Sequence, residues 1–183
     1  MIAVPHYISP EAYLDLEGQS PICHEYRRGL VYAMAGGTDN HDWIALNLLT
    51  LVNLHLGDSE YRFHSGNVKV NYQDEFYYYP DAFVTCDSRD RSDRYIKRHP
   101  QLIVEVLSPS TQAFDLDERL KDYQQLESLE GYVLVFQESQ RVECRRCSGA
   151  NTWETTTYTA GDRLSLKSID LELEIAQLYL GID

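Results

Sequence analysis

The segments YPDAFVTC (residues 79–86) and LIVEVL (residues 102–107) decide the fold of this chain. Each is an apolar run that carries one acid, Asp81 in the first and Glu105 in the second. Lys121 follows on a segment with helical patterning. Two carboxylates that converge with one cation are the smallest set of side chains able to hold a divalent metal ion and to support hydrolysis beside it.

Glu105 is the most informative of these residues because its neighbours are apolar on both sides. Such a run is typical of a central strand that is covered on both faces. A charge in that position is unfavourable unless it is paired or coordinates a metal. Strand alternation places Glu105 on the same face as Leu107, so we expect Lys121 to return to this face from the following helix.

The residues alone also allow simpler roles for the three charged groups. Asp81 follows a proline and can make a turn hydrogen bond. Glu105 can pair with an arginine. Lys121 can form a salt bridge with Asp117, one helical turn earlier.

Working outward, the order of elements predicts one domain over residues 1–183, with an α/β or α+β fold built on a mixed sheet. N-terminal helices and a hairpin are expected before the central run, and one helix is expected after it. Three helices are expected: one starts at Ser9-Pro10, one carries the stripe Ile44, Leu48, Leu51 and Val52, and one runs from Leu116 to Leu126 with Leu116, Leu120 and Tyr123 facing inward. The expected strands cover residues 25–28, 30–34, most of 60–87, 102–107, 131–136, 141–147 and 153–158.

Composition and charge limit the possible functions. The 183 residues are 43% hydrophobic and 25% charged, and the net charge of -13 argues against a basic nucleic-acid surface over the whole molecule. The chain lacks an 18-residue apolar run and a secretory signal, so we expect a cytoplasmic protein that does not cross a membrane. The four cysteines lack a complete zinc-ligand pattern, and we expect buried or half-buried free thiols.

Residues 89–98 form the most basic segment, with five cations against two anions. A loop of this composition can contact phosphates and stack on bases through Tyr95. The alternative is a solvated loop with internal ion pairs. The residues predicted to bind nucleic acid are Arg89, Arg91, Arg94, Lys97 and Arg98.

Several motifs together resemble one bacterial family. They are Pro80-Asp81, the run EVLSPST at 105–111, Asp115, Lys121 and Tyr123, with weaker similarity upstream around Tyr26, Gly29 and His41 and downstream through Glu130 to Val135. This pattern resembles the Uma2 (DUF820) family, which is assigned to the restriction-endonuclease-like PD-(D/E)xK nuclease superfamily.

The resemblance implies a mixed β-sheet flanked by helices and a metal site. Asp81, Glu105, the carbonyl of Val106 and Glu25 would bind Mg2+ or Mn2+, with His41 nearby. Leu107 stands where the superfamily usually has its lysine, and Lys121 would replace it in catalysis. The resemblance also implies hydrolysis of DNA, and it allows a homodimer.

Two other functions remain possible at this stage. A nuclease-fold protein that binds a partner or nucleic acid without cutting fits the acidic charge and the missing lysine at position 107. A glycosidase that uses Asp81 and Glu105 as an acid–base pair would need no metal.

Overall fold

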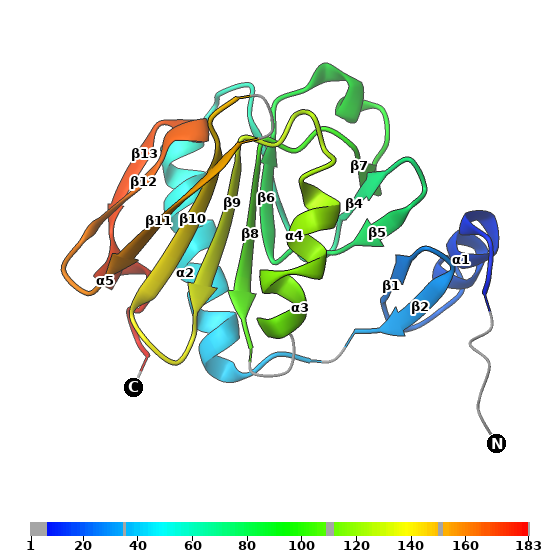
Figure 1. Cartoon of the computed structure of the whole chain (residues 1–183), viewed down its shortest axis with the longest axis horizontal. Helices are drawn as coiled ribbons and strands as arrows, with labels where there is room; N and C mark the ends of the chain where they lie inside the picture. The colour runs from blue at the N-terminus through cyan, green and yellow to red at the C-terminus, as the bar shows by residue number, and fades with distance from the viewer. Residues whose placement is uncertain (1–6, 35, 109–111, 150–151, 183) are drawn as a thin grey trace.

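A computed structural model describes residues 7–34, 36–108, 112–149 and 152–182 (Figure 1). Its main sheet has six strands in the order β11-β10-β9-β8-β6-β3. β8 and β9 run parallel and all other neighbours run antiparallel, so the prediction of a mixed sheet is confirmed. The strands are β3 (Arg62–Ser65), β6 (Ala82–Thr85), β8 (Leu102–Leu107), β9 (Gly131–Phe136), β10 (Arg141–Cys147) and β11 (Trp153–Thr159).

β8 is the central strand, and all six of its residues are buried. Leu102, Val104 and Val106 face α2 (Asp39–Leu56), while Ile103 and Leu107 face a second core around Tyr123. Helix α2 lies on one face of the sheet, and α3 (Gln112–Leu116) and α4 (Glu118–Tyr123) lie on the other (Figure 1). Glu105 shares the face of Ile103 and Leu107, so strand alternation points it toward α4.

The expected stripe on α2 is present. Ile44, Leu48 and Val52 are buried against the sheet, and the helix ends at Gly57, whose φ of 49° is in the left-handed region. The expected helix over residues 116–126 is instead two short helices. Asp117, with φ of -124° and ψ of -71°, separates α3 from α4.

A second sheet of five strands packs beside α4 in the order β2-β1-β5-β4-β7. The expected hairpin is present, and its turn residues Arg28 and Gly29 both have positive φ, as a two-residue type I′ turn requires. Helix α1 (Pro10–Glu17) starts after the N-cap Ser9 and packs Tyr13 against this sheet. The strands are β1 (His24–Arg27), β2 (Leu30–Ala33), β4 (Lys69–Tyr72), β5 (Phe76–Tyr78) and β7 (Ile96–Lys97).

The C-terminal segment completes the core on the α2 side. Its elements bury Leu164, Leu173 and Leu178. They are β12 (Arg163–Leu166), the 3-10 turn η2 (Lys167–Ile169), β13 (Leu171–Glu174) and α5 (Ile175–Leu178).

Two further expectations concerned the cysteines and membrane-spanning helices. The four cysteines are free thiols; Cys86, Cys144 and Cys147 are half-buried as expected, whereas the expectation of a buried or half-buried thiol is wrong for Cys23, which is exposed. Within the described part of the chain, no helix is both long and apolar enough to span a membrane.

Candidate active site

Asp81 and Glu105 lie beside each other because β6 and β8 are antiparallel neighbours. Ala82 is paired with Val104, so the same register carried one residue further sets Asp81 opposite Glu105. The backbone N–H of Asp81 donates to Glu105 Oε2 over 3.3 Å. The N–H of Val106 donates to Asp81 Oδ2 over 2.7 Å, which fixes the Asp81 carboxylate against β8. The predicted convergence of the two acids is therefore present in the structure.

Glu105 is buried, with 4% of its surface exposed, and its second oxygen is also occupied. Oε1 accepts hydrogen bonds from Arg119 Nη1 and from the Tyr123 hydroxyl, each over 3.1 Å. Burial raises the pKa of Glu105 well above its ordinary value; Arg119 opposes this rise, and the nearby carboxylates, with Asp81 first, add to it. The prediction of a costly buried acid is confirmed, and its partner is an arginine.

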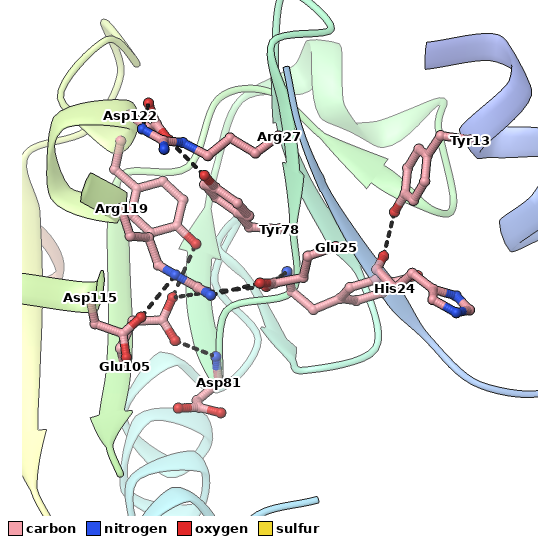
Figure 2. A network of polar contacts seen from close by, with 12 residues as sticks. Tyr13, His24, Glu25, Arg27, Tyr78, Asp81, Glu105, Asp115, Arg119 and Asp122 are labelled. Atoms are coloured by element: carbon pink, nitrogen blue, oxygen red, sulfur yellow. Dashed lines mark hydrogen bonds and ion pairs between the residues drawn. The ribbon is translucent and has the colours of Figure 1, made fainter. Parts of the chain in front are cut away.

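Arg119 is the central cation of the site, and sequence reasoning missed it. Its guanidinium reaches Glu25 Oε2 over 2.7 Å, Glu105 Oε1 over 3.1 Å and Asp115 Oδ1 over 2.9 Å (Figure 2). The same group lies over the ring of Tyr78, 4.7 Å from its centroid. Arg119 therefore joins acids from β1, β8 and α3.

The prediction that Lys121 returns to the Glu105 face is wrong. Its side chain is 62% exposed and pairs with Asp117 over 2.6 Å, as the simpler reading of the sequence allowed. At about 100° per residue, Lys121 lies roughly 200° around the helix from both Arg119 and Tyr123, which occupy the inner face. The missed signal was the helical spacing Asp115, Arg119, Tyr123, which puts these polar groups on one stripe.

Glu25 is present in the cluster, but it serves as a partner of Arg119. Oε1 accepts from Arg119 Nη1 over 3.1 Å and from the backbone N–H of Tyr79 over 3.0 Å. Oε2 accepts from Arg119 Nη2 over 2.7 Å. Both oxygens thus accept from Arg119, which neutralises this carboxylate, and we leave Glu25 out of the proposed metal ligands.

His41 lies next to Asp81, as the family resemblance implied. Its Nε2 is 3.0 Å from Asp81 Oδ1. This hydrogen bond raises the pKa of His41, and burial of the ring opposes the rise. Asp81 is therefore held from two sides, by His41 of α2 and by the backbone of Val106 in β8.

The basic segment lies away from these acids. It connects the end of β6 to the start of β8, whereas Asp81 and Glu105 lie near the opposite ends of these strands. In Figure 1, this connection is at the top of the sheet and α3 is at the bottom. Four residues of β6 at about 3.4 Å each separate the two regions by roughly 14 Å.

The basic segment also contains more buried hydrogen bonds than its composition suggested. Buried Asp90 accepts from the backbone N–H groups of Arg98 and His99, over 2.8 Å and 3.0 Å. Lys97 was predicted to bind nucleic acid, and this is wrong: its side chain is buried and donates to the carbonyls of Asp90 and Asp93. The four arginines Arg89, Arg91, Arg94 and Arg98 are exposed.

A cavity of about 650 Å³ opens over the acids. Asp81, Glu105, Val106 and His41 line one part of it, α3 and α4 line a second, and the β1–β2 hairpin lines a third. Among the described residues, no lysine lines this cavity. The site is thus a recess between the sheet, a helix pair and a hairpin.

The charge balance of the recess favours a cation. Five carboxylates line it against two guanidiniums, those of Arg27 and Arg119, which gives a formal net charge of -3 with His41 counted as neutral; the acids are Glu25, Asp81, Glu105, Asp115 and Glu118. Within the described ranges, no three His, Cys, Asp or Glu side chains are grouped as a metal site. Mg2+ needs fewer protein ligands than that, because it is commonly held by one or two carboxylates and retains several waters. Asp81 and Glu105 fit such an ion.

Comparison with known proteins relates the whole chain to one family. The family model Uma2, described as "Putative restriction endonuclease", matches residues 10–177. The Synechocystis protein slr1290 is 37% identical over 176 residues, covering 96% of this chain and 93% of its own length. A second Synechocystis protein, sll1609, is 29% identical over 159 residues, covering 85% and 90% of the two chains.

A solved structure has the same fold. It is a DUF820 protein from Anabaena variabilis, titled a "putative nuclease", with a TM-score of 0.78 and 18% identity. The match covers 94% of this chain and 97% of the other. The two chains therefore share the arrangement of sheets and helices over nearly their whole length.

Proposed function

This chain belongs to the Uma2 family, and on that premise we propose that it is a divalent-metal-dependent endonuclease that hydrolyses phosphodiester bonds of DNA. One observation carries the proposal. Asp81 and Glu105 meet at the same end of two adjacent strands, and both line a recess with excess negative charge. Such a pair suits the binding of a hard cation beside a phosphate.

The proposed ligands for Mg2+ or Mn2+ are Asp81, Glu105 and the carbonyl of Val106. The N–H and C=O of a strand residue point to the same side, and the N–H of Val106 already points at Asp81. When bound, the ion would lower the pKa of a water molecule and offset the charge of the scissile phosphate.

The chain's own residues position the acids. Arg119 and Tyr123 hold one oxygen of Glu105, and the Asp81 N–H holds the other. Because a guanidinium keeps its proton, Arg119 cannot act as a general base, but it adds fixed positive charge beside the acids. The charge-balancing role expected of Lys121 is thus assigned to Arg119.

A second candidate function is binding without cleavage. It is favoured by the contacts of Arg119, which already neutralises Glu25 and one oxygen of Glu105, and by the exposed position of Lys121. Titration calorimetry with Mn2+ separates the two. A nuclease should bind Mn2+ and lose this binding in Glu105→Gln, whereas a binding module should give the same heats before and after the change.

Cleavage itself is tested with supercoiled, linear and single-stranded DNA in Mg2+ or Mn2+. Asp81→Asn and Glu105→Gln should each reduce the rate on the order of 100-fold or more. Asp58→Asn and Glu127→Gln are matched controls at exposed positions outside the recess and should cut at the wild-type rate. Absence of cleavage by the wild type, or full cleavage by both site variants, contradicts the proposal.

A further inference from the structure

The hairpin wall of the recess presents the aromatic Tyr32 and the apolar Met34 beside Glu25. Tyr32 is the cross-strand partner of Glu25 in the β1–β2 hairpin, and directly paired residues project from the same face. Alternation along β2 puts Val31 on the other face, where it packs with Tyr13 and Tyr26. Tyr32 therefore faces the recess, and both it and Met34 line the cavity.

These side chains are open to a ligand. Tyr32 is 49% exposed and Met34 is 39% exposed. None of the described aromatic or cationic side chains stacks on Tyr32, in contrast to Phe114 on the facing helix, over which Arg119 lies at 5.1 Å. A large, flat and uncovered ring thus stands in the same recess as the acids.

The hairpin that carries this ring is fastened to helix α4 by four ion pairs, two from Arg27 and one each from Glu25 and Arg28. Glu25 pairs with Arg119 over 2.7 Å, and Arg27 pairs with Asp122 over 2.6 Å (Figure 2). Asp122 also accepts from the Tyr78 hydroxyl over 2.6 Å. Because β1 is held on both sides of its centre, the hairpin presents Tyr32 in a set position relative to Glu105.

The recess suits a flexible strand better than a duplex. Glu105 is only 4% exposed, so a phosphate must enter the cavity to approach it. A DNA duplex is stiff over about 150 base pairs and keeps its bases stacked inside. The surroundings also offer little to a duplex backbone, because the net charge is -13 and the exposed arginines of residues 89–98 lie at the other end of β6.

We propose that Tyr32 and Met34 form a stacking subsite for an unpaired nucleobase, so that the substrate is a single-stranded or locally unpaired segment of DNA. This inference rests on the proposed nuclease function and deepens it. A cavity of about 650 Å³ is within the range of about 300–1,000 Å³ that buries small organic ligands, and so has room for a nucleotide beside the acids. Base stacking supplies affinity without phosphate contacts, which an acidic protein needs. Cutting a single strand needs only one site, so cleavage of this substrate would not require a homodimer.

The test measures binding separately from cleavage. A fluorescein-labelled oligothymidylate and the matching duplex are titrated with the full chain in Ca2+, with anisotropy as the readout. The single strand should bind more tightly than the duplex. Tyr32→Ala should weaken this binding by roughly 5- to 150-fold, the effect of losing one base–aromatic stack, and Tyr32→Trp should retain it. Leu54→Ala is the control, because Leu54 is 74% exposed on α2 outside the recess and should leave the affinity unchanged.

A second readout reports stacking itself. An oligonucleotide carrying 2-aminopurine should lose fluorescence on binding to the wild type and regain it with Tyr32→Ala. Equal or tighter binding of the duplex, or unchanged binding by Tyr32→Ala, overturns the inference even if the wild type cuts DNA. The stacking signature in a wild-type protein that fails to cut supports the subsite and contradicts only the nuclease.

Discussion

Replacing Arg119 with methionine tests whether this guanidinium is the internal counter-ion of the acid cluster. Its side chain is 8% exposed and pairs with Glu25, Glu105 and Asp115 over 2.7, 3.1 and 2.9 Å. Removing one partner of a buried ion pair lowers stability by about 3–5 kcal/mol, because the other charge is left uncompensated. In a chain of this size each kcal/mol lowers Tm by about 2–4 °C, so Arg119→Met should unfold roughly 6–20 °C earlier at pH 8.

This loss should depend on pH through Glu105. The pKa of Glu105 is raised well above the ordinary 4.5 by burial, and Arg119 opposes the rise. A carboxyl with a raised pKa binds more protons in the folded state, so its contribution to stability falls as pH increases from 4.5 through the raised value. Removing Arg119 raises this pKa further. The effect of Arg119→Met should therefore be largest at pH 8 and smaller at pH 5.

Thermal and urea unfolding followed by circular dichroism at both pH values give the answer. Arg163→Met is the matched control, because Arg163 is 63% exposed and pairs with an exposed Glu172; it should change stability by no more than about 1 kcal/mol. Adding Glu105→Gln to Arg119→Met should restore part of the loss at pH 8. The reasoning is refuted if Arg119→Met stays within about 1 kcal/mol of the wild type at pH 8, or if its loss is the same at pH 5.

Three further substitutions test other parts of the structure. Lys121→Ala should leave DNA cleavage within about twofold of the wild type and leave stability nearly unchanged, since it removes one exposed helix pair; a large loss of cleavage rate would return Lys121 to the site. Lys97→Met should lower the free energy of urea unfolding by about 1–3 kcal/mol, because two buried carbonyl contacts are lost, whereas exposed Arg94→Ala should be neutral. Burial lowers the pKa of His64 to about 4, so the contribution of neutral His64 to the free energy of unfolding is lost as pH falls from 6.5 toward 4. His64→Phe should therefore gain about 1 kcal/mol relative to the wild type between pH 8 and pH 5, after allowance for solvent screening, as measured by urea unfolding.

The sheet and its two acids were predictable from sequence because their signals are local. An acid within an otherwise apolar strand has few explanations, and Glu105 is buried and paired as the pattern required. The stripe on α2 was equally clear, since Ile44, Leu48 and Val52 recur at helical spacing. In each case, exposing an apolar side chain or burying an unpaired charge would be unfavourable in free energy, so the local sequence is enough to place the residue.

The choice between Arg119 and Lys121 depended on how the helix is oriented. The expected inner face was Leu116, Leu120 and Tyr123. At about 100° per residue, Arg119 lies about 60° from Leu116, but Lys121 lies about 140° from it. The apolar stripe thus already turned Lys121 outward. The superfamily resemblance favoured Lys121 as the cation of the site, whereas helical geometry favoured Arg119.

The position of the basic segment follows from strand direction alone. Asp81 lies just before one strand and Glu105 near the end of the next, and these strands are antiparallel neighbours. That topology brings the two acids together at one end of the strands, and it sends the connection between them, residues 86–101, to the other end. The arrangement that builds the candidate site therefore also keeps the arginines of residues 89–98 away from it. Substrate held at Asp81 and Glu105 must gain its affinity from the hairpin and helix walls of the recess, and Tyr32 is the side chain there best suited to supply it.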